Sequence, residues 1–175
     1  MSIIIDEVKD LYRVIQFKEF RKTEGVTFDI IPVKSLGHID AVDRVLHVHS
    51  AVSPSKVGDV LKPWYMHSHQ EDNLVVLAGT RYVEIYTPQH GKIERFTVTA
   101  DSVYKGDELI YEGGAMLVWP RRVFHRIVSG KKGSASINLA IHYEGFDIKT
   151  NFNIFDVDIK SGEYKVIREG FKDQF

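Results

Sequence analysis

Apolar and polar residues alternate in short runs through most of this chain, and Gly, Pro, Asp or Ser separates one run from the next. An alternation of period two places successive side chains on opposite faces of a β-strand. Residues 43–50, 80–87 and 134–143 show this pattern most clearly. About ten such runs, spaced by turn residues, predict an all-β domain, an antiparallel sandwich or barrel that leaves few strand edges exposed.

The two ends of the chain differ from this middle part. Residues 6–22 fit a helical period and also a period of two, so their structure stays open. Residues 155–159 alternate, and the turn 160–162 leads into 163–167, which predicts a terminal hairpin on the outside of the main sheet or on a second subunit. We expect an N-terminal extension over residues 1–25, a barrel over 26–143 and a C-terminal extension over 144–175.

The composition excludes several classes of protein. The 175 residues contain no cysteine, which removes disulfides, thiolate nucleophiles and cysteine-bound metals and favours the cytoplasm. Twenty-three basic and 24 acidic residues give a net charge of −1, so no nucleic-acid partner is expected. The chain has no signal-peptide pattern and no long apolar run, so no membrane contact is expected. Motifs of nucleophile-elbow hydrolases, P-loop NTPases, dinucleotide-binding enzymes and zincins are absent.

Four of the eight histidines form two His-x-His pairs, His47 with His49 and His67 with His69. Residues i and i+2 of a strand share a face about 6.5 Å apart, so both rings of a pair can converge on one metal ion. Alternating polar residues on a solvated strand face produce the same pattern. For His47 and His49, a second metal site, the wall of a pocket and a polar outer face all stay open.

The second pair stands in a richer context. Glu71, Asp72 and Asn73 follow it, and an apolar strand then ends at Gly79. Further along the chain, Gly114, Pro120 and His125 are spaced as G-x5-P-x4-H. These segments resemble the two motifs of the cupin superfamily, G-x5-H-x-H-x3-4-E-x6-G and G-x5-P-x-G-x2-H-x3-N. Three motif positions differ, because Leu61, Arg122 and Ser129 replace two glycines and an asparagine.

The resemblance covers about residues 26–143 and implies an RmlC-like cupin fold, an antiparallel β-barrel also described as a double-stranded β-helix or jelly roll. It also implies one divalent metal ion, with His67, His69, His125 and an acidic residue as ligands. Counting back from Gly79 favours Asp72 as that residue over Glu71 or Asn73. Iron, manganese, nickel and zinc all suit such nitrogen and oxygen ligands.

The function that this resemblance implies is a metal-dependent enzyme, of the dioxygenase or isomerase type, acting on a small polar or anionic molecule. Superfamily members commonly pair, so a homodimer is expected. Arg122 is a candidate clamp for a carboxylate or phosphate, although a solvated turn explains it equally. Trp64 and Tyr82 are candidates for the wall of a substrate pocket, and core packing is the alternative for both.

A second resemblance lies within the same superfamily. The stretch HQEDNLVVLAG at 69–79 and the tail INLAIHYEGFD resemble relatives of dTDP-4-dehydrorhamnose 3,5-epimerase. That resemblance implies a metal-independent epimerase or ketoisomerase of nucleotide sugars, with His67 as base and Tyr143 as acid. The Gly-Leu-His setting of that base is absent, because Tyr65 and Met66 precede His67. A non-catalytic sensor that binds a small molecule in the barrel is the third hypothesis.

Overall fold

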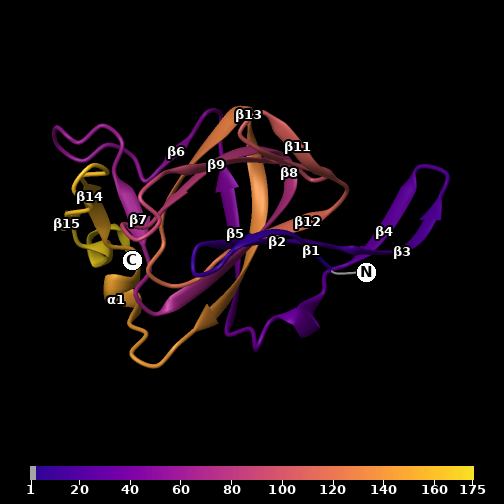
Figure 1. Ribbon diagram of the computed structural model, residues 1–175, viewed down its shortest axis with the longest axis horizontal. Coiled ribbons are helices and arrows are strands. Elements are labelled where there is room, and N and C mark those ends of the chain that lie inside the picture. Colours follow the sequence, from indigo (N-terminus) through magenta and orange to yellow (C-terminus); the bar gives the residue numbers. More distant parts are fainter. Residues whose placement is uncertain (1–2) are drawn as a thin grey trace.

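The computed structural model describes residues 3–175, so Met1 and Ser2 of the expected N-terminal extension lie outside the described residues. Strands are the main elements of these residues, which also contain three short helical turns (Figure 1). The elements are β1 (Ile4–Val8), β2 (Tyr12–Gln16), β3 (Lys18–Thr23), β4 (Val26–Ile30), η1 (Val33–Ser35), β5 (Ala41–His47), β6 (Val52–Ser53), β7 (Trp64–Met66), β8 (Gln70–Tyr86), β9 (Glu94–Val98), β10 (Ser102–Lys105), β11 (Glu108–Glu112), β12 (Ala115–Trp119), β13 (Phe124–His142), α1 (Ile148–Asn151), β14 (Ile154–Val157), β15 (Tyr164–Arg168) and η2 (Gly170–Asp173).

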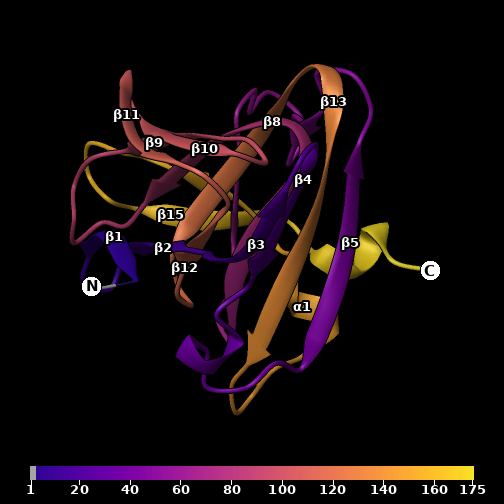
Figure 2. The same cartoon turned by 90° about the vertical axis from the view of Figure 1, so that its right-hand side faces the viewer.

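Two long strands, β8 and β13, form the spine of the barrel. They pair antiparallel from Phe124 opposite Tyr86 to His142 opposite Gln70. The register shifts between Ser129 and Ser134 and again between Ala135 and Ser136, and Figure 2 shows that β13 bends strongly along its length. Strands β5, β6 and β7 pair with β13, and strands β9 and β12 pair with β8. The predicted all-β antiparallel fold is therefore confirmed.

Residues 6–22 lie mostly in strands, as the alternation of period two predicts, and not in a helix. Strand β2 pairs with β12, with Val14 opposite Leu117, and its Tyr12, Val14 and Ile15 are buried. Strands β3 and β4 form a separate hairpin, hereafter the N-terminal arm (residues 18–30), which projects from one end of the molecule (Figure 1). The arm's side chains are mostly exposed.

The C-terminal segment forms an antiparallel hairpin of β14 and β15. Strand β14 also pairs with β7, with Phe155 opposite Trp64, so the hairpin extends the main sheet at this edge. Phe155 and Trp64 are buried in one apolar cluster with Tyr86 and Phe124. The chain between the barrel and the hairpin, including α1, is thereby held against β7.

No helix within residues 3–175 has the length and apolar character needed to cross a membrane.

Candidate active site

A cavity of about 150 Å³ lies inside the barrel. Inward-facing residues of β5, β7, β8, β12 and β13 form its wall, because alternate residues of each strand point to the same face. On β13, for example, His125 and Ile127 face the cavity, whereas Phe124 packs in the cluster beneath the C-terminal hairpin. Most of the residues that line this cavity have polar or charged side chains.

Two histidines and one carboxylate meet at one end of the cavity. His67 Nε2 lies 3.2 Å from Asp72 Oδ2, and His125 Nε2 lies 3.8 Å from the same oxygen. The two imidazole rings have centroids 4.8 Å apart. All three side chains are buried, so water screens their interactions little.

Hydrogen-bond donors surround the Asp72 carboxylate. Gln70 Nε2 and Asn138 Nδ2 donate to Asp72 Oδ1 at 2.6 and 2.7 Å, and Trp119 Nε1 donates to Oδ2 at 3.0 Å. Gln70 lies on the same strand as Asp72, whereas Asn138 of β13 and Trp119 of β12 come from neighbouring strands, with Trp119 opposite Asp72 in the sheet. The carboxylate is therefore held in one orientation and stabilised as an anion.

The segment after the barrel completes the site. The carbonyl oxygen of Asn151, the last residue of α1, accepts a hydrogen bond from His67 Nδ1. The Asn151 side chain donates to Gln70 Oε1 at 2.9 Å, and the ring of Phe152 stands edge-on to His67 at 5.2 Å. His67 is thus fixed on one side by Asp72 and on the other by the C-terminal segment.

These contacts separate the pKa values of the two histidines. Burial lowers the pKa of His67, but the charge of Asp72 and the hydrogen bonds to Asp72 and Asn151 outweigh it, so this pKa is raised. Burial opposes ionisation of Asp72, yet His67 and the surrounding donors hold its pKa well below the usual range. Burial and the positive charge of His67 lower the pKa of His125 to about 4. These surroundings therefore favour the protonated form of His67 and the neutral form of His125.

Several residues predicted from the sequence lie elsewhere. His69 Nδ1 is buried without a hydrogen-bond partner among residues 3–175, and its ring packs against Gly145 outside the cavity wall. The hydroxyl of Tyr143 donates to Glu71 at 3.4 Å, and Tyr143 does not line the cavity either. The tyrosine nearest to the histidines is Tyr65, whose ring centroid lies 6.0 Å from that of His125.

Arg122 contacts the site through its backbone and not through its side chain. Its side chain is exposed, but its backbone N–H donates to the carbonyl oxygen of His67 at 2.7 Å. Its φ of 66° lies in the left-handed region that favours glycine. Arg122 occupies the place of a glycine in the second cupin motif, so the chain keeps the backbone turn while it changes the residue.

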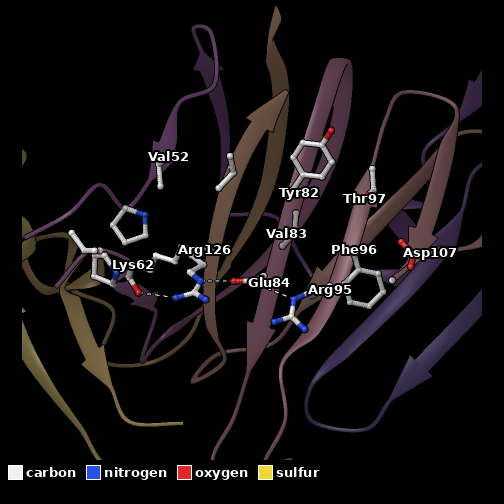
Figure 3. Close-up of a pocket in the computed structure, with 15 residues that line it drawn as sticks. Val52, Lys62, Tyr82, Val83, Glu84, Arg95, Phe96, Thr97, Asp107 and Arg126 are labelled. Carbon is white, nitrogen blue, oxygen red and sulfur yellow. Dashed lines mark hydrogen bonds and ion pairs between the residues drawn. The ribbon is translucent and has the colours of Figure 1, made fainter. Parts of the chain in front are cut away.

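Trp64 and Tyr82, the two predicted wall residues, do not line the cavity. Trp64 is buried, and the guanidinium of Arg126 lies 3.9 Å from its ring centroid. Tyr82 is half exposed and lines an outer groove of about 490 Å³ over β8, β9 and β13 (Figure 3). In that groove the Glu84 carboxylate forms ion pairs with Arg126 at 2.5 Å and with Arg95 at 2.9 Å.

The alternation of the strands contained a signal for some residues that motif analysis missed. Gln70 precedes Asp72 by two residues and Asn138 lies on a predicted strand, so their shared face was open to prediction. Asn151 had no such signal, because it lies outside both motifs and reaches His67 only through the folding back of the C-terminal segment.

His47 and His49 separate in the structure. His47 lines the cavity, and its Nδ1 lies 2.8 Å from the hydroxyl of Ser129. His49 stands in an exposed turn with a φ of 53°. Of the interpretations left open for this pair, the wall of a pocket fits His47.

Comparison with known proteins gives structural matches only. No protein-family model and no curated protein sequence matches the chain. A dTDP-4-dehydrorhamnose 3,5-epimerase from Elizabethkingia anophelis is similar, with a TM-score of 0.62, 13% identity and coverage of 93% of this chain and 86% of that one. The sugar 3,4-ketoisomerase QdtA from Thermoanaerobacterium thermosaccharolyticum, in complex with TDP, has a TM-score of 0.56 at 13% identity, covering 80% and 85%. The TDP-quinovose 3,4-ketoisomerase WlaRB from Campylobacter jejuni has a TM-score of 0.55 at 10% identity, covering 83% and 93%.

The prediction that the site holds a divalent metal ion is wrong. The similar structures are epimerases and ketoisomerases, the group whose resemblance implies chemistry without a metal. The ligand atoms of His67, Asp72 and His125 do lie within 4.8 Å of one another, but His69 is not among them. Asp72 already accepts three N–H groups, and His67 uses one nitrogen on Asn151 and turns the other to Asp72. The atoms of His67 and Asp72 that a metal would need are therefore engaged with other groups of the protein.

The three similar structures agree with the topology of this chain. Identities of 10–13% are low, so they establish the fold and leave the activity open. The matched region extends over the barrel that carries both histidine segments. The chain is therefore a protein of the RmlC-like cupin fold.

Proposed function

We propose that this protein is a metal-independent isomerase that moves a proton at a carbon next to the ketone of a sugar, as in ketoisomerases and epimerases of nucleotide sugars. The observation that carries the proposal is a pair of buried histidines that face one cavity with their rings 4.8 Å apart, in surroundings that favour the protonated form of His67 and the neutral form of His125. Two titratable groups whose pKa values are separated by their surroundings are typical of an acid–base pair. The similar structures described as 3,4-ketoisomerases and as a 3,5-epimerase support it.

His125 has the free lone pair that a base requires. Its Nδ1 donates to the carbonyl oxygen of Val123 at 3.2 Å, which leaves Nε2 unprotonated and directed toward His67 and Asp72. Both nitrogens of His67 are engaged, so His67 serves better as the cationic partner than as the base implied by the epimerase resemblance. Tyr143 has no part in this proposal, because its hydroxyl faces Glu71.

The reaction begins when His125 Nε2 takes the proton from the carbon next to the ketone, and the C–H electron pair forms the double bond of an enolate. The positive charge of His67 stabilises the ketone oxygen, which becomes negative. To shift the ketone, the hydroxyl group on the neighbouring carbon gives its proton to this oxygen and becomes the new carbonyl, and His125 returns its proton to the former ketone carbon. To invert the centre, a proton is added instead to the opposite face of the original carbon, and the ketone re-forms. Asp72 is a positioning residue that holds His67 protonated and oriented.

Deuterium exchange tests this function. The wild-type protein is incubated in D₂O with dTDP-4-keto-6-deoxyglucose and related keto-sugars, and mass spectrometry follows deuterium at the carbons next to the ketone. We expect exchange in the wild type and a loss of at least about 100-fold in His125→Asn and His67→Asn, the size typical of general acid–base catalysis.

His49→Asn is the matched control. His49 is exposed and has a positive φ that asparagine tolerates, so its exchange rate should equal that of the wild type. A wild-type protein that exchanges no deuterium with any keto-sugar of the panel contradicts the proposed function.

We also propose that the protein forms a homodimer through the N-terminal arm. An isolated two-stranded hairpin is at best marginally stable in water, yet this arm pairs with no other strand within residues 3–175. It exposes Phe20 and Phe28, whose ring centroids lie 5.6 Å apart. The outer face of β5 exposes Val42 and Leu46, which offers an apolar surface to the arm of a second copy. The cytoplasmic location stays a prediction.

A further inference from the structure

A buried arginine lines the cavity at a distance from the acid–base pair. Arg81 of β8 is 1% exposed, and within residues 3–175 no carboxylate lies within ion-pair distance of its guanidinium. Burial lowers its pKa to about 10, so Arg81 stays charged at neutral pH. A buried charge without an opposite charge is costly, and this fold keeps one in the wall of the barrel cavity.

The partners of Arg81 are neutral. Its Nε donates to the hydroxyl of Ser134 at 3.1 Å, and its Nη2 donates to the carbonyl oxygen of Val45 at 3.1 Å. The Ser134 hydroxyl lies 2.7 Å from that of Ser129, which in turn contacts His47 Nδ1 at 2.8 Å. These contacts orient the guanidinium and leave its positive charge uncompensated.

A second polar group in the wall of the same cavity also lacks a partner, on Ser136, which lies opposite Val45, the residue whose carbonyl accepts from Arg81. The hydroxyl of Ser136 lines the same cavity, belongs to a residue that is 1% exposed, and makes no hydrogen bond within the described chain. A buried hydroxyl without a partner costs free energy that a bound ligand recovers. The charge of Arg81 and the hydroxyl of Ser136 are therefore two independent groups of one cavity wall that a ligand acceptor would satisfy.

The acidic side chains of the cavity lie at its other end. Asn138 Nδ2 donates to both Asp72 and Asp43, at 2.7 and 3.2 Å, which places Asp43 beside the acid–base pair. Arg81 lies opposite Ser129 on β13, four residues from His125, or about 13 Å along the strand. Both side chains reach inward from these positions. One end of the cavity thus holds the two aspartates and the two histidines, and the other end holds the positive charge of Arg81.

We propose that Arg81 and Ser136 bind a carboxylate of the substrate, so that the molecule held between them and His125 is an acidic keto-sugar or a keto acid of similar size. A guanidinium matches a carboxylate in shape and charge, and one positive charge balances one negative charge. A cavity of about 150 Å³ accommodates only a small reacting portion of a ligand, one end of which would meet Arg81. This inference rests on the proposed function for taking the cavity as the substrate site, but carboxylate binding is measurable without turnover.

The test compares two sugars that differ in one group. Binding of D-glucuronate and of D-glucose to the full-length protein is measured by titration calorimetry, with inorganic phosphate as a third probe. We expect glucuronate to bind and glucose to bind at least tenfold more weakly. Arg81→Gln should weaken glucuronate binding about 10- to 100-fold, the effect of losing charge-assisted hydrogen bonds.

Further variants keep the result interpretable. Arg95→Gln, which changes an exposed arginine of the outer groove, should bind glucuronate as the wild type does. Ser136→Ala removes a hydroxyl that has no partner within residues 3–175, so it should fold normally and still weaken glucuronate binding, even if Arg81→Gln fails to fold. His125→Asn should keep glucuronate binding while it loses deuterium exchange, which separates failure of this inference from failure of the proposed function.

Equal affinity for glucose and glucuronate, no binding of glucuronate at millimolar concentration, or tighter binding of phosphate than of glucuronate each overturns the carboxylate subsite. Weakening by Arg95→Gln equal to that by Arg81→Gln overturns it as well.

Discussion

Single residues at the bend of the barrel show how closely the strands approach. Gly79 has a φ of 72°, and a Cβ there would lie 2.1 Å from the carbonyl oxygen of Gly133 on β13. A Cβ on Gly133 would in turn lie 2.3 Å from the carbonyl oxygen of His47. Only residues without a side chain allow three strands to bend together here. The glycine that closes the first cupin motif thus has a steric role.

Gly79→Ala should be the more destabilising of two matched glycine substitutions. Gly91 has a similar φ of 75°, but a Cβ added there would meet no atom within 4 Å, so Gly91→Ala isolates the conformational strain, about 1–3 kcal/mol. Gly79→Ala adds a backbone clash and should cost clearly more in the free energy of unfolding. Urea denaturation of both variants measures this, and equal costs would contradict the steric role of Gly79.

The two histidines predict the pH dependence of deuterium exchange. His125 is active as a base when it is neutral, so the rate should rise with pH through its pKa of about 4. His67 is active when protonated, so the rate should fall as pH rises through its pKa, which lies above the ordinary value of 6.5. A bell-shaped profile with an acidic limb well below pH 6 is expected. An acidic limb near pH 6.5 would show that His125 is not the base.

At the scale of elements, the C-terminal hairpin supports the site without belonging to the barrel. Strand β14 covers the edge of β7, and α1 brings the Asn151 carbonyl to His67. The aromatic ring of Phe155 holds the hairpin in place, 5.6 Å from the ring of Phe124 in an edge-on arrangement. Packing of the hairpin and orientation of His67 are therefore coupled through a short stretch of chain.

Phe155→Ala should destabilise the protein by about 3–5 kcal/mol, because it leaves a cavity in a buried cluster. Val166→Ala on the adjacent strand changes a side chain that is 44% exposed and should cost less than about 0.5 kcal/mol. Chemical denaturation gives both values, and deuterium exchange at a temperature where both variants are folded reports on His67. If Phe155→Ala costs no more than Val166→Ala, the hairpin is not held by this cluster.

At the scale of the whole molecule, the N-terminal arm and the C-terminal hairpin lie at opposite ends (Figure 1). The C-terminal hairpin is bound to its own barrel, whereas the arm presents apolar side chains away from it. An exposed apolar surface of this kind marks a contact with another molecule. In the dimer that we propose, the partner is a second copy of the chain, which also carries the exposed face of β5.

Sedimentation analysis should therefore show a dimer for the wild type and a monomer for the double variant Phe20→Ser with Phe28→Ser. Loss of this apolar pair removes contacts with the second copy, while the barrel keeps its core because neither residue belongs to it. Phe171→Ser, at an exposed phenylalanine near the C-terminus, is the control and should stay dimeric. A monomeric wild type at tens of micromolar concentration rules out the dimer.

Local pattern in the chain was sufficient to predict the antiparallel all-β fold, because the period of alternation and the turn residues are properties of neighbouring positions. The resemblance to the cupin motifs predicted that His67, Asp72 and His125 share one centre, and their ligand atoms lie within 4.8 Å of one another. Neither pattern contains the register between distant strands or the path of the C-terminal segment. For this reason the packing of His69 against Gly145, the contact of Asn151 with His67 and the unpaired charge of Arg81 follow only from the folded structure. Among these features, the contact with Asn151 engages a ring nitrogen of His67, which is then not available to a metal ion.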